Sequence, residues 1–198
     1  MRLLLIRHPA PLVAPHTCYG ASDIDADPTA LADALMALQP LLHDESGLVR
    51  SSPLRRCTAL AVPLAARLRA PPPLLDARLA EMDFGDWELR PWDSIARREI
   101  DAWAADPVRY APGGGETVLQ VAARIADFLD EAMGQPDAAH IVVCHAGTIR
   151  LLAAMHAEAP ATIRRGGRLD RTHLEAVALQ AAASPNAIAY GSLLTLQF

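Results

Sequence analysis

The chain has 198 residues, of which 52% are hydrophobic and 21% are charged, and this composition excludes a disordered protein. Its formal net charge is −5, and its eighteen cationic residues are all arginine; a net negative charge disfavours a nucleic-acid-binding protein. The length predicts one domain over residues 1–198, with a cap-like insertion at about 82–115.

The first half of the chain alternates short apolar runs with amphipathic stretches. Leu3–Ile6 is predicted to be a strand buried on both faces, and Gly47–Ser51 a second strand. A helix is predicted to start at Pro28 with Asp27 as its N-cap, and Ser52, followed by proline, predicts a second start of this kind. The inward stripe of the first helix is Leu31, Leu35, Leu38 and Leu42.

In the middle of the chain, Leu74–Glu81 predicts a weak strand followed by a loop, and the insertion, Met82–Gly115, comes next. The insertion lacks a strand pattern, contains all three tryptophans, and is expected to hold one helix around Asp93–Ala104 over one end of the sheet. Thr117–Met133 is a clear amphipathic helix. The run HIVVCH (140–145) predicts a strand, AGTIR opens another helix, and GSLLTLQF (191–198) predicts the last strand.

Short strands that alternate with helices predict an α/β fold with a mostly parallel central sheet. Ligands bind such sheets beyond the carboxyl ends of the strands. Arg7 and His8 stand at that end of the first strand, and Pro9 lacks the N–H that a continuing strand needs. We therefore expect a functional site at this edge.

Charged and imidazole side chains also follow the other predicted strands. Arg55 lies in the first turn of the second helix, while Arg56 lies about 100° further round it, so Arg55 is the candidate. Glu81 follows the third strand, and Asp83, Asp86 and Glu88 are alternatives for its role. His145 ends the fourth strand and precedes a helix N-terminus, which offers free N–H groups.

This set suits a phosphate group. Arginine presents a planar, permanently charged fork to phosphate oxygens, and cations stabilise a phosphoryl group during transfer. An imidazole can be the nucleophile, and a carboxylate can protonate the leaving oxygen and later deprotonate water. No metal is required where arginines supply the positive charge.

Five motifs in this order, LIRHP, SSPLRRC, EMDFGDWE, PGGGET and CHAGTIR, resemble the histidine phosphatase, or phosphoglycerate mutase-like, superfamily. CYGASD and YGSLLTL resemble its α-ribazole phosphatase branch. The resemblance implies a three-layer α/β/α sandwich, no cofactor, and an insertion that covers the active-site edge. It implies that His8 is the nucleophile, that Glu81 is the general acid and base, and that the phosphoryl oxygens are bound by Arg7, Arg55 and His145.

The implied function is hydrolysis of a small phosphomonoester through a phosphohistidine, with α-ribazole 5′-phosphate of cobalamin synthesis as the first candidate substrate. A sugar phosphate, a nucleotide or a phosphoprotein is an alternative substrate. Phosphoglycerate mutase-type transfer is an alternative reaction, and a catalytically weak phospho-ligand binding protein is a third interpretation. The third interpretation rests on Pro9, because the family usually has glycine there.

Other features leave alternatives open. Glu116 and Thr117 either cap a helix or bind a ligand, and the tryptophans form either the core of the insertion or an aromatic lid. Ile163–Asn186 is longer than expected before the final strand in this branch, with Gly166 and Gly167 breaking it before a helix. This segment makes a homodimer one expectation.

Three cysteines without a paired spacing predict neither a disulfide framework nor a zinc site, and favour the reducing cytoplasm. The first apolar run is too short for a signal peptide or a membrane span, so we expect no membrane association.

Overall fold

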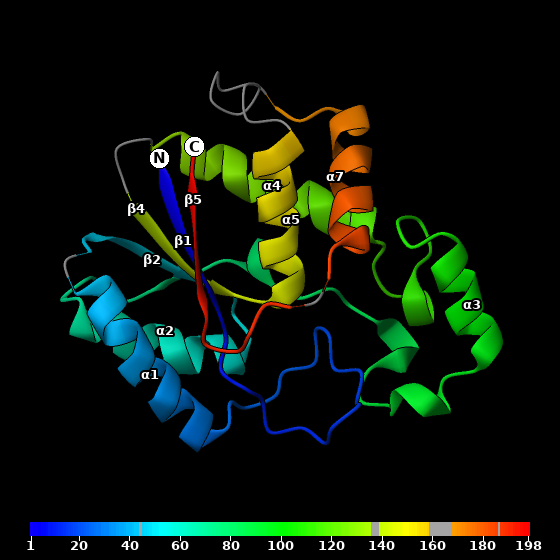
Figure 1. Ribbon diagram of the computed structural model, residues 1–198, viewed down its shortest axis with the longest axis horizontal. Coiled ribbons are helices and arrows are strands. Elements are labelled where there is room, and N and C mark those ends of the chain that lie inside the picture. The colour runs from blue at the N-terminus through cyan, green and yellow to red at the C-terminus, as the bar shows by residue number, and fades with distance from the viewer. Residues whose placement is uncertain (44, 136–138, 159–167, 186) are drawn as a thin grey trace.

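The computed structural model describes residues 1–43, 45–135, 139–158, 168–185 and 187–198 (Figure 1). Five strands form one sheet in the order β3-β2-β4-β1-β5. They are β1 (Arg2–Arg7), β2 (Gly47–Ser51), β3 (Leu74–Leu75), β4 (Ala139–Cys144) and β5 (Leu193–Gln197). Four run parallel, and β5 pairs antiparallel with β1, so the predicted α/β class with a mostly parallel sheet is confirmed.

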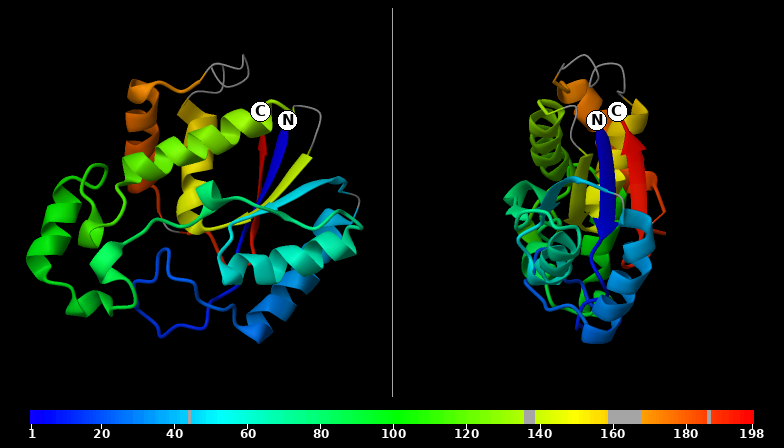
Figure 2. Two further views of the ribbon diagram at one scale, coloured as in Figure 1. Left: turned by 180° about the vertical axis from the view of Figure 1, so that it is seen from behind. Right: turned by 90° about the vertical axis from the view of Figure 1, so that its left-hand side faces the viewer.

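Helices cover both faces of the sheet, which gives the expected three layers (Figures 1 and 2). The main helices are α1 (Pro28–Leu42), α2 (Arg55–Arg67), α3 (Arg97–Ala105), α4 (Val118–Met133), α5 (Ala146–Glu158) and α7 (Arg171–Ala183). One face packs against α1 and α2, and the other against α4, α5 and α7. None of the helices in the described ranges combines the length and the apolar character needed to cross a membrane.

The alternation of side chains along β1 explains why this strand is buried on both faces. Leu4 and Ile6 pack into the core with α1 and α2, whereas Leu3 and Leu5 pack into the core with α4 and α5. Successive side chains of a strand point to opposite faces, so an unbroken apolar run fits a central position. Its carboxyl end, where Arg7 lies, is thereby fixed beside the end of β4, because Arg7 pairs with Cys144.

The predicted helix caps at Asp27 and Thr117 are confirmed, and the one at Ser52 is wrong. Asp27 Oδ1 accepts a hydrogen bond from the backbone N–H of Ala30 at 2.8 Å, and Thr117 forms a capping box with Gln120 at the start of α4. The helix after β2 does not start beside Ser52: it begins at Arg55, with Leu54 as an N-cap that makes no side-chain bond. Ser52 instead contacts the candidate site, as described below.

Residues 82–115, all of them described, contain no strand, as predicted. They form three short 3₁₀ helices, η2 (Gly85–Trp87), η3 (Trp92–Ser94) and η4 (Pro112–Gly114), together with α3. The predicted helix at 93–104 therefore begins later, at Arg97. In Figure 1 the segment with α3 lies beside the sheet, past the end of α4. Trp87, which is 1% exposed, anchors its small core.

The long segment before β5 contains a helix, as predicted. α7 begins after Asp170, whose side chain accepts a hydrogen bond from the backbone N–H of His173, and it packs against α4 and α5. The predicted break at Gly166 and Gly167 lies outside the described residues. Leu74–Glu81 begins with a short strand, β3, as predicted, and the segment after it contains a 3₁₀ turn, η1 (Ala77–Leu79).

Candidate active site

His8 lies directly beyond β1 and is buried, with 2% of its surface exposed. Its backbone N–H donates to the carbonyl of Cys144 at 2.9 Å, which continues the pairing of β1 with β4. Its Nδ1 lies 2.6 Å from the carbonyl oxygen of Pro9. Since a carbonyl can only accept, Nδ1 carries the proton, and Nε2 keeps its lone pair. The ring is thus held in the tautomer that a nucleophilic Nε2 requires.

His145 lies at the end of β4, with its ring centroid 5.0 Å from that of His8. Its Nε2 lies 2.8 Å from Ser52 Oγ, and its Nδ1 lies 3.3 Å from Arg56 Nη2. A guanidinium can only donate, so Nδ1 of His145 accepts and Nε2 carries the proton. Ser52, predicted only as a helix cap, therefore orients the second histidine.

Arg56 projects from the first turn of α2 and is completely buried. Its two terminal nitrogens donate to the carbonyls of Ser22 and Gly20, each at 2.6 Å. The loop that provides these carbonyls is held by the carboxylate of Glu88, which accepts from the backbone N–H groups of Ala21 and Ser22 at 2.8 and 3.1 Å. The guanidinium is consequently fixed beside the histidine pair.

The prediction that Arg55 faces this edge is wrong. Its side chain is 55% exposed and forms ion pairs with Asp23 and Asp25 at 3.3 and 2.9 Å. Because α2 begins at Arg55 and buries Leu60 and Leu64, the position on the same face one turn before Leu60 is 56. That i, i+4 series was the available signal for Arg56.

Arg7 reaches the site from the last position of β1. Its Nη1 donates to the carbonyl of Ile188 at 2.5 Å, and its guanidinium lies 3.8 Å from the centroid of the Tyr190 ring. The Tyr190 ring centroid lies 5.5 Å from that of His8. Tyr190 belongs to the YGSLLTL motif, but nothing in the sequence indicated that it packs on both residues.

Glu81 approaches the same edge from the segment after η1. Its Oε2 accepts from the backbone N–H of Gly147 at 3.2 Å, and its Oε1 accepts from the N–H of Met82 at 3.1 Å. Gly147 is the second residue of α5, so the carboxylate lies at a helix N-terminus, where free N–H groups stabilise negative charge. The alternatives to Glu81 have other contacts: Glu88 holds the loop described above, and Asp83 accepts from Gly85 N.

A cavity of about 510 Å³ opens at this edge. Its polar wall includes Arg7, Tyr19, Glu81, Gly147 and Arg150. Its apolar wall includes Phe84, Trp92, Trp103, Val118, Val121 and Leu151. Trp92 and Trp103, whose stacked rings have centroids 6.1 Å apart, line the cavity and also pack against the core of the insertion, in which Trp87 is buried.

Burial and positive charge keep both histidines neutral. Burial lowers the pKa of His8 to about 3, with further lowering by the charges of Arg56 and Arg7, against a raising effect of the hydrogen bond to Pro9. Burial, His8 and Arg56 also hold the pKa of His145 well below its usual range. A neutral imidazole at position 8 can attack phosphorus at neutral pH.

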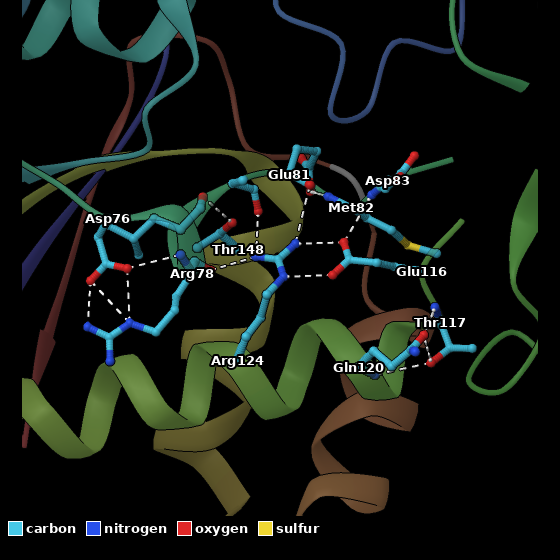
Figure 3. A network of polar contacts seen from close by, with 12 residues as sticks. Asp76, Arg78, Glu81, Met82, Asp83, Glu116, Thr117, Gln120, Arg124 and Thr148 are labelled. Atoms are coloured by element: carbon cyan, nitrogen blue, oxygen red, sulfur yellow. Dashed lines mark hydrogen bonds and ion pairs between the residues drawn. The ribbon is translucent and has the colours of Figure 1, made fainter. Parts of the chain in front are cut away.

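The structure thus brings four of the five predicted side chains, Arg7, His8, Glu81 and His145, to one edge and adds Arg56 in place of Arg55. Among the described residues, no group of three or more His, Cys, Asp or Glu side chains is arranged to hold a metal ion. Glu116 neither caps a helix nor faces the cavity; it pairs with Arg124, whose guanidinium holds the backbone beside Glu81 (Figure 3).

A family model described as the histidine phosphatase superfamily, branch 1, matches residues 3–183. The chain belongs to the histidine phosphatase superfamily. Glucosyl-3-phosphoglycerate phosphatase of Mycolicibacterium vanbaalenii is 31% identical over 169 residues, which cover 77% of this chain and 72% of that protein. A putative phosphoserine phosphatase of Hydrogenobacter thermophilus is 25% identical over 158 residues, 78% of this chain and 77% of that protein.

A solved structure from the same superfamily is the α-ribazole phosphatase from Shigella flexneri. It superposes with a TM-score of 0.71 at 28% identity and covers 86% of each chain. These phosphatases are similar to the present chain over most of its length, and they are named for different substrates.

Proposed function

We propose that this histidine phosphatase hydrolyses a small phosphomonoester through a phosphohistidine on His8. The observation that carries the proposal is the fixed tautomer of His8, because the bond to Pro9 leaves Nε2 as a free nucleophile beside two guanidinium groups. That bond also weakens the binding-protein alternative: it uses the backbone carbonyl of residue 9, which proline retains where the family usually has glycine.

The reaction has two steps. Nε2 of His8 attacks phosphorus, the bond between phosphorus and the ester oxygen breaks, and Glu81 gives its proton to that leaving oxygen. Glu81, now a carboxylate, then removes a proton from water, which attacks phosphorus and releases inorganic phosphate and the free imidazole. In both steps Arg7, Arg56 and His145 would stabilise the phosphoryl oxygens, His145 by redirecting its Nε2–H from Ser52 to the phosphoryl group, and the proposal requires no metal.

As the substrate we propose α-ribazole 5′-phosphate as the first candidate, with α-ribazole as the leaving group, which would place the chain in cobalamin synthesis. The similarity to the Shigella flexneri enzyme supports it, together with the stacked Trp92 and Trp103 on the cavity wall, since aromatic side chains suit a flat ring system. The relatives named for glucosyl-3-phosphoglycerate and phosphoserine provide the competing substrates for a test.

The test compares wild-type protein with His8→Asn on p-nitrophenyl phosphate in the presence of EDTA. We expect wild-type turnover, loss of at least about 10³-fold in the variant, and a phosphorylated wild-type protein after alkaline quenching. Equal turnover by both proteins would refute the mechanism, and loss of wild-type activity in EDTA would refute its independence of metal.

A second assay ranks substrates. Initial rates are compared for α-ribazole 5′-phosphate, glucosyl-3-phosphoglycerate and phosphoserine, with 2,3-bisphosphoglycerate as the probe for mutase-type transfer. We expect the highest kcat/KM for α-ribazole 5′-phosphate. A higher value for another ester would replace the substrate while keeping the mechanism, and rapid phosphate exchange with the bisphosphate would favour the mutase.

A further inference from the structure

We propose that Arg124 and Glu116 act as a positioning pair that fixes the backbone around Glu81 and thereby the proton donor of the reaction. The inference rests on the proposed role of Glu81 and extends it to two residues that do not touch the cavity. Figure 3 shows the guanidinium of Arg124, from the middle of α4, pointing at the segment that carries Glu81.

The segment that carries Glu81 has no strand or helix to hold it. The 3₁₀ turn η1 ends at Leu79, and the following residues are outside regular structure until η2. Hydrogen bonds from the Arg124 side chain hold its backbone instead. Arg124 Nη1 donates to the carbonyls of Arg78 and Ala80 at 2.5 and 2.8 Å, and its Nη2 donates to the carbonyl of Glu81 at 3.3 Å.

The pair with Glu116 completes the coordination of the guanidinium. Nε and Nη2 of Arg124 donate to the two carboxylate oxygens of Glu116, both at 2.9 Å. An arginine has five N–H donors in a planar fork, so the two bonds to Glu116 and three to carbonyls use all of them. Although burial acts to raise the pKa of Glu116, the hydrogen bonds and charge of Arg124 hold that pKa below its ordinary value.

Glu116 also fixes the chain on the far side of Glu81. Its Oε2 accepts from the backbone N–H of Asp83 at 3.1 Å, and its own N–H donates to the carbonyl of Asp83 at 2.8 Å. Both peptide groups of Asp83 are therefore held, and a side chain at Gly115 would approach the Asp83 carbonyl within 2.2 Å. Glu81 is thus clamped by Arg124 before it and by Glu116 after it.

This clamp matters for proton transfer because a catalytic group must lie within hydrogen-bond reach of the reacting oxygen. A displacement of about 1 Å in a catalytic group lowers the rate by about 10²-fold. The loss depends on the leaving group: a weakly basic phenolate departs without full protonation, whereas an alkoxide requires it. A misplaced Glu81 should therefore reduce turnover of alkyl phosphates much more than that of p-nitrophenyl phosphate.

The main variant is Arg124→Gln, and Arg124→Lys is its conservative partner. Both are assayed for kcat/KM on p-nitrophenyl phosphate and on glycerol 2-phosphate, beside Glu81→Gln. We expect Arg124→Gln to lose about 10-fold on the aryl ester and about 10²-fold or more on the alkyl ester. Lysine carries its three donors on one nitrogen and cannot bridge Glu116 and three carbonyls, so it should not restore the alkyl activity.

A matched control is Arg78→Gln. The Arg78 side chain points away from Glu81 and forms ion pairs with Asp76 and Glu131, both at 2.6 Å, so its loss perturbs the same region through comparable interactions. Here we expect equal losses on the two substrates. Thermal unfolding of each variant identifies those that fold. If Arg124→Gln does not fold, Glu116→Gln, which keeps one acceptor, is assayed in its place.

The decisive measurement is the double variant Arg124→Gln/Glu81→Gln. If Arg124 acts through Glu81, the double variant should lose no more on glycerol 2-phosphate than Glu81→Gln alone. Additive losses in the double variant, or equal losses of Arg124→Gln on both esters, would overturn the inference. The proposed function would still hold if the wild type is active and His8→Asn is not. Equal activity of wild type and His8→Asn would instead overturn the function itself.

Discussion

The hydroxyl oxygens of Tyr19 and Tyr190 lie 2.8 Å apart and are hydrogen bonded, joining the loop after β1 to the segment before β5. Tyr190 also packs on the His8 ring and beneath the Arg7 guanidinium. Although the described wall of the cavity includes both tyrosines, His8 is not part of it and is 2% exposed. Tyr190 therefore separates His8, the proposed nucleophile, from the cavity, and we expect a substrate to displace the hydrogen-bonded tyrosine pair.

We expect Tyr19→Phe and Tyr190→Phe each to raise kcat/KM for p-nitrophenyl phosphate by about 3- to 10-fold. The removed hydrogen bond is worth about 0.5–1.5 kcal/mol, and each variant keeps the ring that packs on Arg7 and His8. Steady-state kinetics of both single variants and the double variant provide the check. The double variant should match the singles, because either change removes the same bond; lower activity in every variant would mean that the hydroxyls bind substrate.

The neighbours Arg55 and Arg56 provide a matched pair of substitutions. Arg56→Gln should lower kcat/KM by about 10²–10³-fold, as the loss of one buried donor to a transition-state oxyanion does elsewhere. Arg55→Gln should change it by less than about threefold, because an exposed ion pair is worth about 0–1 kcal/mol. Steady-state assays of both variants over the same series of substrate concentrations test which arginine acts in the site, and a larger effect at position 55 would contradict the assignment of Arg56.

The lowered pKa of His8 predicts that its ring does not titrate near neutrality. A histidine with a pKa of about 3 is neutral at every pH from 8 down to about 4, whereas an ordinary one gains a proton near 6.5. NMR spectra of histidine-labelled protein between pH 8 and 5 should show constant His8 resonances, assigned by their absence in His8→Asn. Titration with a midpoint near 6.5 would show that the ring is solvated and charged, contrary to the structure.

Gly147→Ala is expected to lower activity without lowering the stability of the fold. A Cβ at this position would lie 2.3 Å from Glu81 Oε1, so the carboxylate must move away. The obstructing atom is the end of a flexible side chain, and alanine favours a helix over glycine by about 1 kcal/mol, so α5 should not be destabilised. We expect an unchanged or higher midpoint of thermal unfolding.

In the same variant, kcat/KM for glycerol 2-phosphate should fall by about 10-fold or more, with a smaller loss for p-nitrophenyl phosphate. Gly134→Ala is a suitable control, since among the described residues its added Cβ would meet only the Glu131 carbonyl, at 3.2 Å. Equal activity of Gly147→Ala and wild type on the alkyl ester would show that the position of Glu81 in this structure is not the catalytic one.

Local sequence patterns predicted the elements that depend on local signals. The apolar run Leu3–Ile6 and the Asp27 cap are signals contained in a few neighbouring residues, and the strand and the helix that they predict are both present. Ser52 and Arg55 did not follow their local pattern, because Ser52 contacts His145, which lies 93 residues further along the chain. No local rule reveals that partner, and the later start of α2 places Arg56 on its buried face.

In the site, too, residues with a local signal were predictable and those fixed by distant contacts were not. Strand ends identified His8 and His145 because parallel strands deliver their carboxyl ends to one edge, whereas Glu81 followed from its motif and lies beyond η1 rather than at the end of β3. The supporting contacts were not predictable, since Arg124 and Glu116 meet the Glu81 segment only after α4 packs across η1. Tyr19 and Tyr190 belong to sequence motifs, but their contact was not predictable because it joins positions 171 residues apart.

The position of β1 between β4 and β5 has a consequence for how activity is acquired. Both neighbours of this strand come from the last third of the chain, so His8, the proposed nucleophile, is synthesised before the two strands that flank β1. Such distant pairing is slow, because the intervening chain must be ordered before the contact is gained. During refolding, catalysis should thus return with the final closure of the sheet, and a nascent chain that lacks β4 should be inert.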